Sequence, residues 1–136
     1  MYETNAPRVY LVRQEEAGEP APAVRSALVN ELRAASRSGP VAVVLELGRV
    51  GGVDASMAAF WLGLLEDRQA DVAVVAVVTS ARSLRLATLA FSAVVSLRHL
   101  PVEVRAHGRT EDALTWSAAA LSRAAAARRL ASLAQA

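Results

Sequence analysis

Apolar and polar positions along the chain follow two different periods. Residues 8–13 (RVYLVR) alternate polar and apolar side chains, the pattern of a half-buried strand. Residues 41–47 (VAVVLEL) and 71–79 (DVAVVAVVT) are almost continuously apolar, which is typical of parallel strands buried on both faces. Residues 102–106 (VEVRA) form a short fourth run. The pattern therefore predicts four strands.

Helical spacing fills the intervals between these strands. Apolar side chains recur at Val24, Leu28 and Leu32, one face of a helix. The predicted helices span residues 23–36, 55–69 and 80–97, and a last one is capped by Thr110, with Glu111 and Asp112 at its positive end. Strands and helices that alternate in this way imply right-handed crossovers. We expect an α/β fold with a mostly parallel four-stranded sheet.

The 136 residues suffice for one domain with one core. We place this domain at residues 1–121. Residues 122–136 (SRAAAARRLASLAQA) have strong helix propensity but no wide apolar stripe. They are predicted to form an Ala/Arg-rich helical extension.

The composition narrows the choice of chemistry. Hydrophobic residues make up 54% of the chain and aromatic residues only 4%, so Val, Leu and Ala must build the core. Cysteine is absent, which excludes disulfides and thiolate metal sites; lysine and isoleucine are absent too, a bias that suggests a GC-rich, bacterial genome. We read no secretory signal, and the longest apolar run, Val72–Val78, is too short to cross a bilayer. A cytoplasmic protein is expected.

Charge is distributed unevenly along the chain. The net charge is only +2, although the sequence pI is about 9.9. Residues 1–71 hold seven Arg against ten acids, and residues 72–136 hold eight Arg against three acids. The second half is therefore weakly basic, but its bases do not cluster with stacking aromatic residues, so we expect no nucleic-acid binding.

Catalytic motifs are missing from the sequence. His99 and His107 flank the predicted fourth strand without a nearby carboxylate pair and are expected to be surface-loop residues. The glycines within residues 48–52 match neither the dinucleotide fingerprint nor a phosphate-binding loop, which needs a lysine. Ser56 lacks the flanking glycines of a nucleophile elbow. We expect no enzyme activity, no cofactor and no metal.

The junction at residues 48–61 (GRVGGVDASMAAFW) joins a buried strand to a helix. If Ala55 is the first helical residue, Asp54 is the N-cap. Ser56 then lies in the first turn, beside unpaired amide donors and the positive end of the helix dipole. A phosphate there would be satisfied by those donors but repelled by Asp54. Ser56 is therefore a candidate phosphorylation site that alters a surface without refolding the domain.

The segment VAVVLELGRVGGVDASMAAF resembles STAS domains, the anti-sigma-factor antagonist fold, in which a buried strand leads through a turn to Asp-Ser-Ser-Gly or Asp-Ser/Thr-x-Gly. RTEDALTW resembles the start of the last helix in that family. The resemblance implies that Ser56 matches the phosphorylatable serine and Asp54 the acid before it. Met57 stands where the family usually has glycine, and we expect its bulk to restrict the approach of a kinase.

The later half resembles a second group within this fold, the SpoIIAA-like or STAS/SEC14-type proteins. VAVVTSARSLRLATLAF followed by VEVRAHGRTEDALTW is similar to their strand, long apolar helix, edge strand and Ala-Leu-x-Trp ending. Members of this group generally lack the phosphoserine. The single strand predicted before the first helix also favours this group.

The predicted third helix is too apolar for a helix that packs on one sheet. Its polar residues fall in one narrow arc: Arg82, Arg85, Thr88, Ser92 and Ser96. The apolar side chains, Leu86 and Ala90 among them, spread over roughly 200°, about twice the width that one sheet buries. Either the tail helix covers the surplus or an interface lies there.

These observations favour a non-catalytic regulatory protein–protein interaction domain of STAS type. Its expected partner is a regulatory kinase, an ATPase subunit or a second copy in a homodimer, engaged through residues 48–57 and the second and third helices. The candidate contact residues are Asp54, Ser56, Met57, Arg82, Arg85, Leu86 and Ala90. One alternative is a module for a lipid or other apolar ligand, with Arg82 and Arg85 facing anionic groups; contact with a membrane is not favoured. Another is a homo-oligomeric scaffold.

Overall fold

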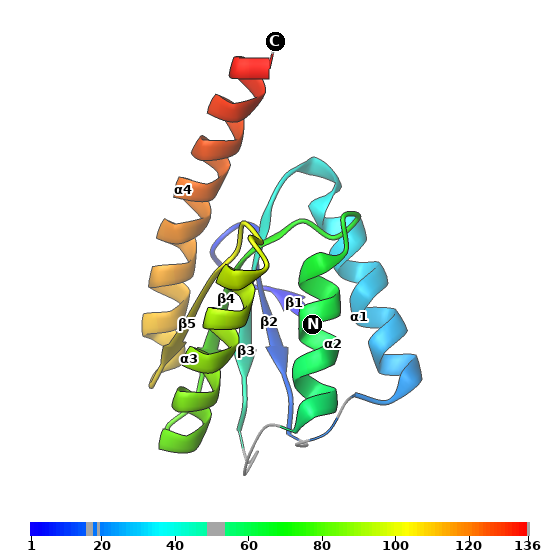
Figure 1. Cartoon of the computed structure of the whole chain (residues 1–136), viewed down its shortest axis with the longest axis vertical. Helices are drawn as coiled ribbons and strands as arrows, with labels where there is room; N and C mark the ends of the chain where they lie inside the picture. The colour runs from blue at the N-terminus through cyan, green and yellow to red at the C-terminus, as the bar shows by residue number, and fades with distance from the viewer. Residues whose placement is uncertain (16–17, 19, 49–53, 136) are drawn as a thin grey trace.

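The computed structural model covers the whole chain and describes residues 1–15, 18, 20–48 and 54–135 (Figure 1). Within these residues a five-stranded sheet carries helices on both faces. The strands are β1 (Tyr2–Glu3), β2 (Val9–Arg13), β3 (Val41–Glu46), β4 (Val72–Val78) and β5 (Glu103–His107). The helices are α1 (Pro22–Ala35), α2 (Ala55–Glu66), α3 (Arg82–Leu97) and α4 (Thr110–Gln135), with a 3₁₀ turn, η1 (Ser36–Ser38), after α1.

The strands lie side by side in chain order, β1-β2-β3-β4-β5. Strands β2 to β5 are parallel, so the predicted α/β fold with a mostly parallel sheet is confirmed. The predicted count of four strands is wrong, because β1 pairs antiparallel with β2 and places Tyr2 opposite Leu11. A two-residue strand has no period that a sequence pattern can reveal. Two strands therefore precede α1, which removes the single-strand argument for the second group of resembling proteins.

The sheet separates two cores. On β3, Val41, Val43 and Leu45 face α1, α2 and α3, whereas Ala42 and Val44 face α4 (Figure 1). Leu, Val, Met and Trp side chains fill the first core, and alanines are frequent in the second. This alternation follows from the period of two in a strand, and it places three helices on one face and one on the other.

Helix α2 ends at Glu66, three residues before the predicted end. The side chain of Asp67 accepts a hydrogen bond from the Gln69 amide at 2.9 Å, a turn that competes with further helix. The other Asp67 oxygen, Oδ2, accepts from Arg33 Nε of α1 at 2.9 Å. Asp67 thus ends α2 and ties it to α1.

Helix α4 continues without a break through the predicted domain boundary at residue 121. Ala113, Ser117, Ala120 and Leu121 are buried on the sheet, and beyond them the helix projects past the rest of the molecule (Figure 1). Ion pairs hold its outer half: Arg123 to Glu103 at 3.4 Å, and Arg128 to Asp71 at 2.8 Å. Over the described residues, none of the helices combines the length and the apolar character needed to traverse a bilayer.

Candidate functional site

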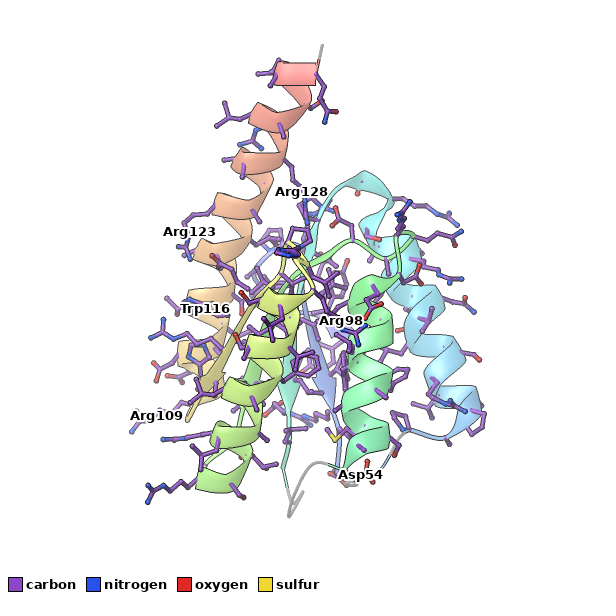
Figure 2. The ribbon with its side chains drawn as sticks, in the orientation of Figure 1. Asp54, Arg98, Arg109, Trp116, Arg123 and Arg128 are labelled. Carbon is purple, nitrogen blue, oxygen red and sulfur yellow. The ribbon has the colours of Figure 1, made fainter. Side chains whose placement is uncertain are left out.

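The start of α2 lies at the edge of the sheet where the parallel strands end (Figure 2). Asp54 has an extended backbone, and its Oδ1 accepts a hydrogen bond from the Met57 amide at 2.9 Å. This is the geometry of an N-cap bonded to the third residue of the helix. The predicted capping role of Asp54 is confirmed.

Ser56 is the second residue of α2 and is exposed. Its hydroxyl donates to the same oxygen of Asp54 at 2.8 Å. The hydrogen bonds from the Met57 amide and the Ser56 hydroxyl hold the pKa of Asp54 below its usual value. The exposed corner therefore carries a charged carboxylate with a serine hydroxyl bound to it.

The side chain of Met57 does not take part in this surface. It is 2% exposed and packs in the core among Leu45, Trp61 and Phe91. A helix turns about 100° per residue, so Met57 lies on a different side of α2 from Ser56, and this side meets the core. The expectation that Met57 adds bulk against a partner is wrong, and a partner docked at Ser56 meets no Met57 side chain.

The glycine-rich turn that precedes Asp54 is only partly described. Residues 49–53, which include Gly51 and Gly52, lie outside the described residues, so the predicted contact segment 48–57 is described at Gly48 and from Asp54 onward. The loop after β2 reaches the same corner, because a Cβ on Gly18 would lie 3.5 Å from Asp54 Oδ2. Gln14 donates to the Gly18 carbonyl at 3.0 Å.

The start of α3 lies at the same edge of the sheet, since β4 runs parallel to β3. Arg85 Nε donates to the Thr79 carbonyl at 3.4 Å, which holds this side chain against the end of β4. The side chain of Arg82 is exposed and makes no hydrogen bond or ion pair with the described part of the chain. This edge of the sheet thus combines the carboxylate that caps α2 with two arginines in the first turn of α3.

Helix α3 packs on the sheet through one side only. Leu84, Thr88 and Val95 are buried, and the Thr88 hydroxyl donates to the Leu84 carbonyl at 2.8 Å. On the opposite side, Leu86 is 57% exposed and Leu97 is 79% exposed. Helix α4 covers the other face of the sheet, so the alternative in which the tail covers the surplus apolar face of α3 is wrong (Figure 1).

A small apolar pocket lies between α2 and α3. Its volume is about 60 Å³, and its lining includes Met57, Trp61, Ala87 and Phe91. Small-molecule sites commonly measure about 300–1,000 Å³. The pocket is therefore too small for a lipid chain in this conformation.

His107 departs from the expectation of a surface-loop residue. It is the last residue of β5 and is partly buried, with its ring centroid 5.2 Å from that of Trp116 on α4. Its Nε2 is buried and has no hydrogen-bond partner among the described residues, and burial lowers the pKa of His107. This contact could not be predicted from the sequence, because the end of β5 and the helix α4 meet only in the fold.

Glu46 forms a second polar tie that the sequence did not indicate. It accepts from Arg13 Nε at 3.1 Å and from the Thr110 hydroxyl at 3.0 Å. Thr110, expected as the cap of the last helix, is the first residue of α4, and its hydroxyl serves this contact. Glu46 thus links β2, β3 and α4 and has a structural role.

Among the described residues, no group of three or more His, Asp or Glu side chains is placed to hold a metal ion. No family model, no curated protein and no solved structure matches this chain. The functional proposal therefore rests on the geometry of the α2 corner and on the sequence resemblance.

Proposed function

We propose that the chain is a non-catalytic regulatory interaction domain of STAS type, whose partner is a regulatory kinase or an ATPase subunit. The observation that carries the proposal is the α2 corner, where an exposed serine hydroxyl donates to a charged capping carboxylate at 2.8 Å. The sequence resemblance to STAS domains supports the proposal, because it implies that Ser56 matches the regulatory serine and Asp54 the acid before it.

The corner can change its charge without disturbing the fold. Negative charge is favourable beside the positive N-terminal end of a helix, so an anionic group at position 56 leaves α2 intact. The same charge lies beside the Asp54 carboxylate, and a docked partner must desolvate both anions. A kinase would transfer the γ-phosphoryl group of ATP to the Ser56 Oγ, with release of ADP and of the hydroxyl proton. The phosphate would thus weaken docking at this edge.

The experiment begins with isolation of the partner by the immobilised chain from an extract of its native host, followed by binding measurements with purified proteins. We expect Ser56→Asp to weaken binding at least tenfold and Ser56→Ala to bind like the wild type. Ser132→Asp adds the same charge to the exposed tail of α4 and is the matched control. Equal affinity of Ser56→Asp and Ser132→Asp would refute the switch.

A loss of binding must be separated from a loss of folding. Asp54→Ala removes the cap of α2, and we expect a melting midpoint lower by about 2–6 °C. Ser56→Asp should melt within about 2 °C of the wild type, because the charge suits the helix start. Intact mass of the protein from its native host completes the test. A phosphorylated fraction that disappears in Ser56→Ala supports the proposal, and its absence under all growth conditions contradicts it.

A further inference from the structure

The outward face of α3 is apolar, and the described part of the chain leaves it uncovered. Six side chains form it: Leu86, Leu89, Ala90, Ala93, Val94 and Leu97. We call them the α3 stripe. All six are exposed, and the three leucines have exposed fractions of 57%, 66% and 79%. Contiguous apolar surface of this kind marks an interaction site.

The centre of the α3 stripe reads the same in both directions along the helix. Leu86, Ala90, Ala93 and Leu97 follow one another at spacings of four, three and four residues, the seam spacing of paired helices. The order is large, small, small, large. Leu89 and Val94 flank this seam at equal distances from its midpoint between residues 91 and 92.

We propose that the α3 stripe binds the α3 stripe of a second copy of this chain, in antiparallel orientation. A two-fold axis across the seam midpoint places Leu86 opposite Leu97 of the second copy, and Ala90 opposite its Ala93. A two-fold interface must be self-complementary, and a palindromic seam has that property. The alanines at the centre allow the two helices to approach closely while the leucines fill both ends.

The charges of α3 favour the same orientation. Within the helix the charged residues are Arg82 and Arg85, both in the first turn, where the positive end of the helix dipole opposes cations. Arg98, at the C-cap, is paired with Glu66 at 2.8 Å. Arg85 is held by the Thr79 carbonyl, whereas Arg82 has no partner within the described residues. In an antiparallel pair, Arg82 lies beside the negative C-terminal end of the other α3. A parallel pair would instead bring the cationic ends of both helices together.

The size of the stripe sets the strength of the dimer. From Leu86 to Leu97 the seam measures roughly 16 Å at 1.5 Å per residue. One helix pair of this length gives an interface at the small end of specific contacts, below about 1,200 Å² in total. We therefore expect a reversible dimer with Kd in the micromolar range. The inference rests on the proposed function only in treating the chain as an interaction domain, because Asp54 and Ser56 lie outside the stripe.

The first experiment tests the register by cross-linking. The chain has no cysteine, so Leu86→Cys and Leu97→Cys each supply one thiol, and circular dichroism verifies that both variants fold. A mixture of the two, mildly oxidised, should give a disulfide-linked heterodimer, identified by intact mass. Either variant alone should give almost none, since equal positions lie roughly 16 Å apart along the seam and a disulfide needs Cα atoms within about 7 Å. Efficient homodimers of Leu86→Cys would overturn the antiparallel register.

The second experiment tests the contribution of the Arg82 charge to dimerisation, measured by sedimentation velocity at 1–500 µM. We expect Arg82→Glu to raise the dimer Kd at least fivefold while the fold is kept, because an acid suits the start of its own helix. Arg37→Glu, an exposed substitution in η1, is the matched control and should dimerise like the wild type. Equal Kd values for the two variants would overturn the role of Arg82.

The remaining outcomes separate the dimer from other occupants of the stripe. A wild-type chain that stays monomeric at 500 µM overturns the proposal. If such a monomer co-sediments with vesicles of phosphatidylcholine and phosphatidylglycerol, and Leu86→Glu abolishes this, the stripe is a membrane contact. A monomer that still responds to Ser56→Asp in partner binding overturns the dimer and leaves the proposed function standing.

Discussion

Helices α3 and α4 lie on opposite faces of the same sheet and differ in what they present to solvent. Each buries one side: α3 through Leu84, Thr88 and Val95, and α4 through Ala113 and Ala120. The outward side of α4 over the sheet carries polar or small residues, Glu111, Asp112, Thr115 and Ala119. The outward side of α3 carries the α3 stripe. Packing on a sheet therefore does not require an apolar outward side. The apolar character of the α3 stripe is not explained by the packing of α3 on the sheet.

The largest effect on the free energy of unfolding should come from truncating a buried leucine of α3, compared with an exposed leucine of the same helix. Leu84 is 1% exposed, so Leu84→Ala leaves a cavity and should cost about 2–5 kcal/mol of unfolding free energy. Leu86→Ala, two residues further along on the exposed side, should change this free energy by less than about 0.5 kcal/mol in the monomer. Urea denaturation at low micromolar concentration measures both. Similar losses for the two variants would show that Leu86 is buried.

On α4 the corresponding comparison enlarges an alanine on each side of the helix, and its effect on the free energy of unfolding should be smaller. Ala113 is fully buried against the sheet, and Ala113→Leu overpacks this contact at a cost of about 1–3 kcal/mol. Ala119→Leu adds the same volume on the outward side and should be nearly neutral. The measurement is again urea denaturation. A neutral Ala113→Leu would mean that α4 packs loosely enough to shift away from the sheet.

The two helices also show what the sequence can predict. Apolar runs and helical spacing located the four parallel strands and the four helices to within about three residues, because burial imposes those periods. The side of α3 that meets the sheet was not predictable, since apolar residues cover most of its circumference. Thr88, part of the polar arc, is buried because its hydroxyl is satisfied within the helix by the Leu84 carbonyl.

The candidate site was predictable only where the signal is local. Asp54 caps α2 through a hydrogen bond to an amide three residues further along the chain, and a contact over so few residues can be predicted from the sequence. The inward direction of Met57 and the contact of His107 with Trp116 depend on how the elements assemble. In both cases the contacts join residues that are distant in the sequence, and a single sequence does not show which distant residues lie close together in space.

Removal of the outer half of α4 should have a modest effect. A chain that ends at Ser122 loses the ion pairs of Arg123 with Glu103 and of Arg128 with Asp71. These side chains are partly solvent-exposed, and each such pair contributes about 0–1 kcal/mol. We expect the shortened chain to fold with a melting midpoint lower by a few degrees, as measured by circular dichroism. Failure to fold would place the tail inside the domain and contradict a boundary at residue 121.

The smallest effect concerns the pH dependence of the α4 side. Burial holds the pKa of His107 below its usual value of 6.5, so the unfolded chain binds a proton more readily than the folded one. Stability is therefore lost as the pH falls through about 6.5 toward the lower folded pKa. His107→Gln should lose less of its melting midpoint between pH 7 and pH 5 than the wild type.

The alanine-rich contact between α4 and the sheet has a consequence for amide hydrogen exchange. Alanines bury less apolar surface per residue than the Leu, Val, Met and Trp side chains under α1, α2 and α3. Segments with the weakest packing open first, each as a cooperative unit. Within α4, the amides of the projecting end should exchange fastest. Those of residues 113–121 should follow, when the whole helix detaches from the sheet. The amides of β3 and β4, which α1, α2 and α3 cover on the opposite face of the sheet, should stay protected until the domain unfolds globally.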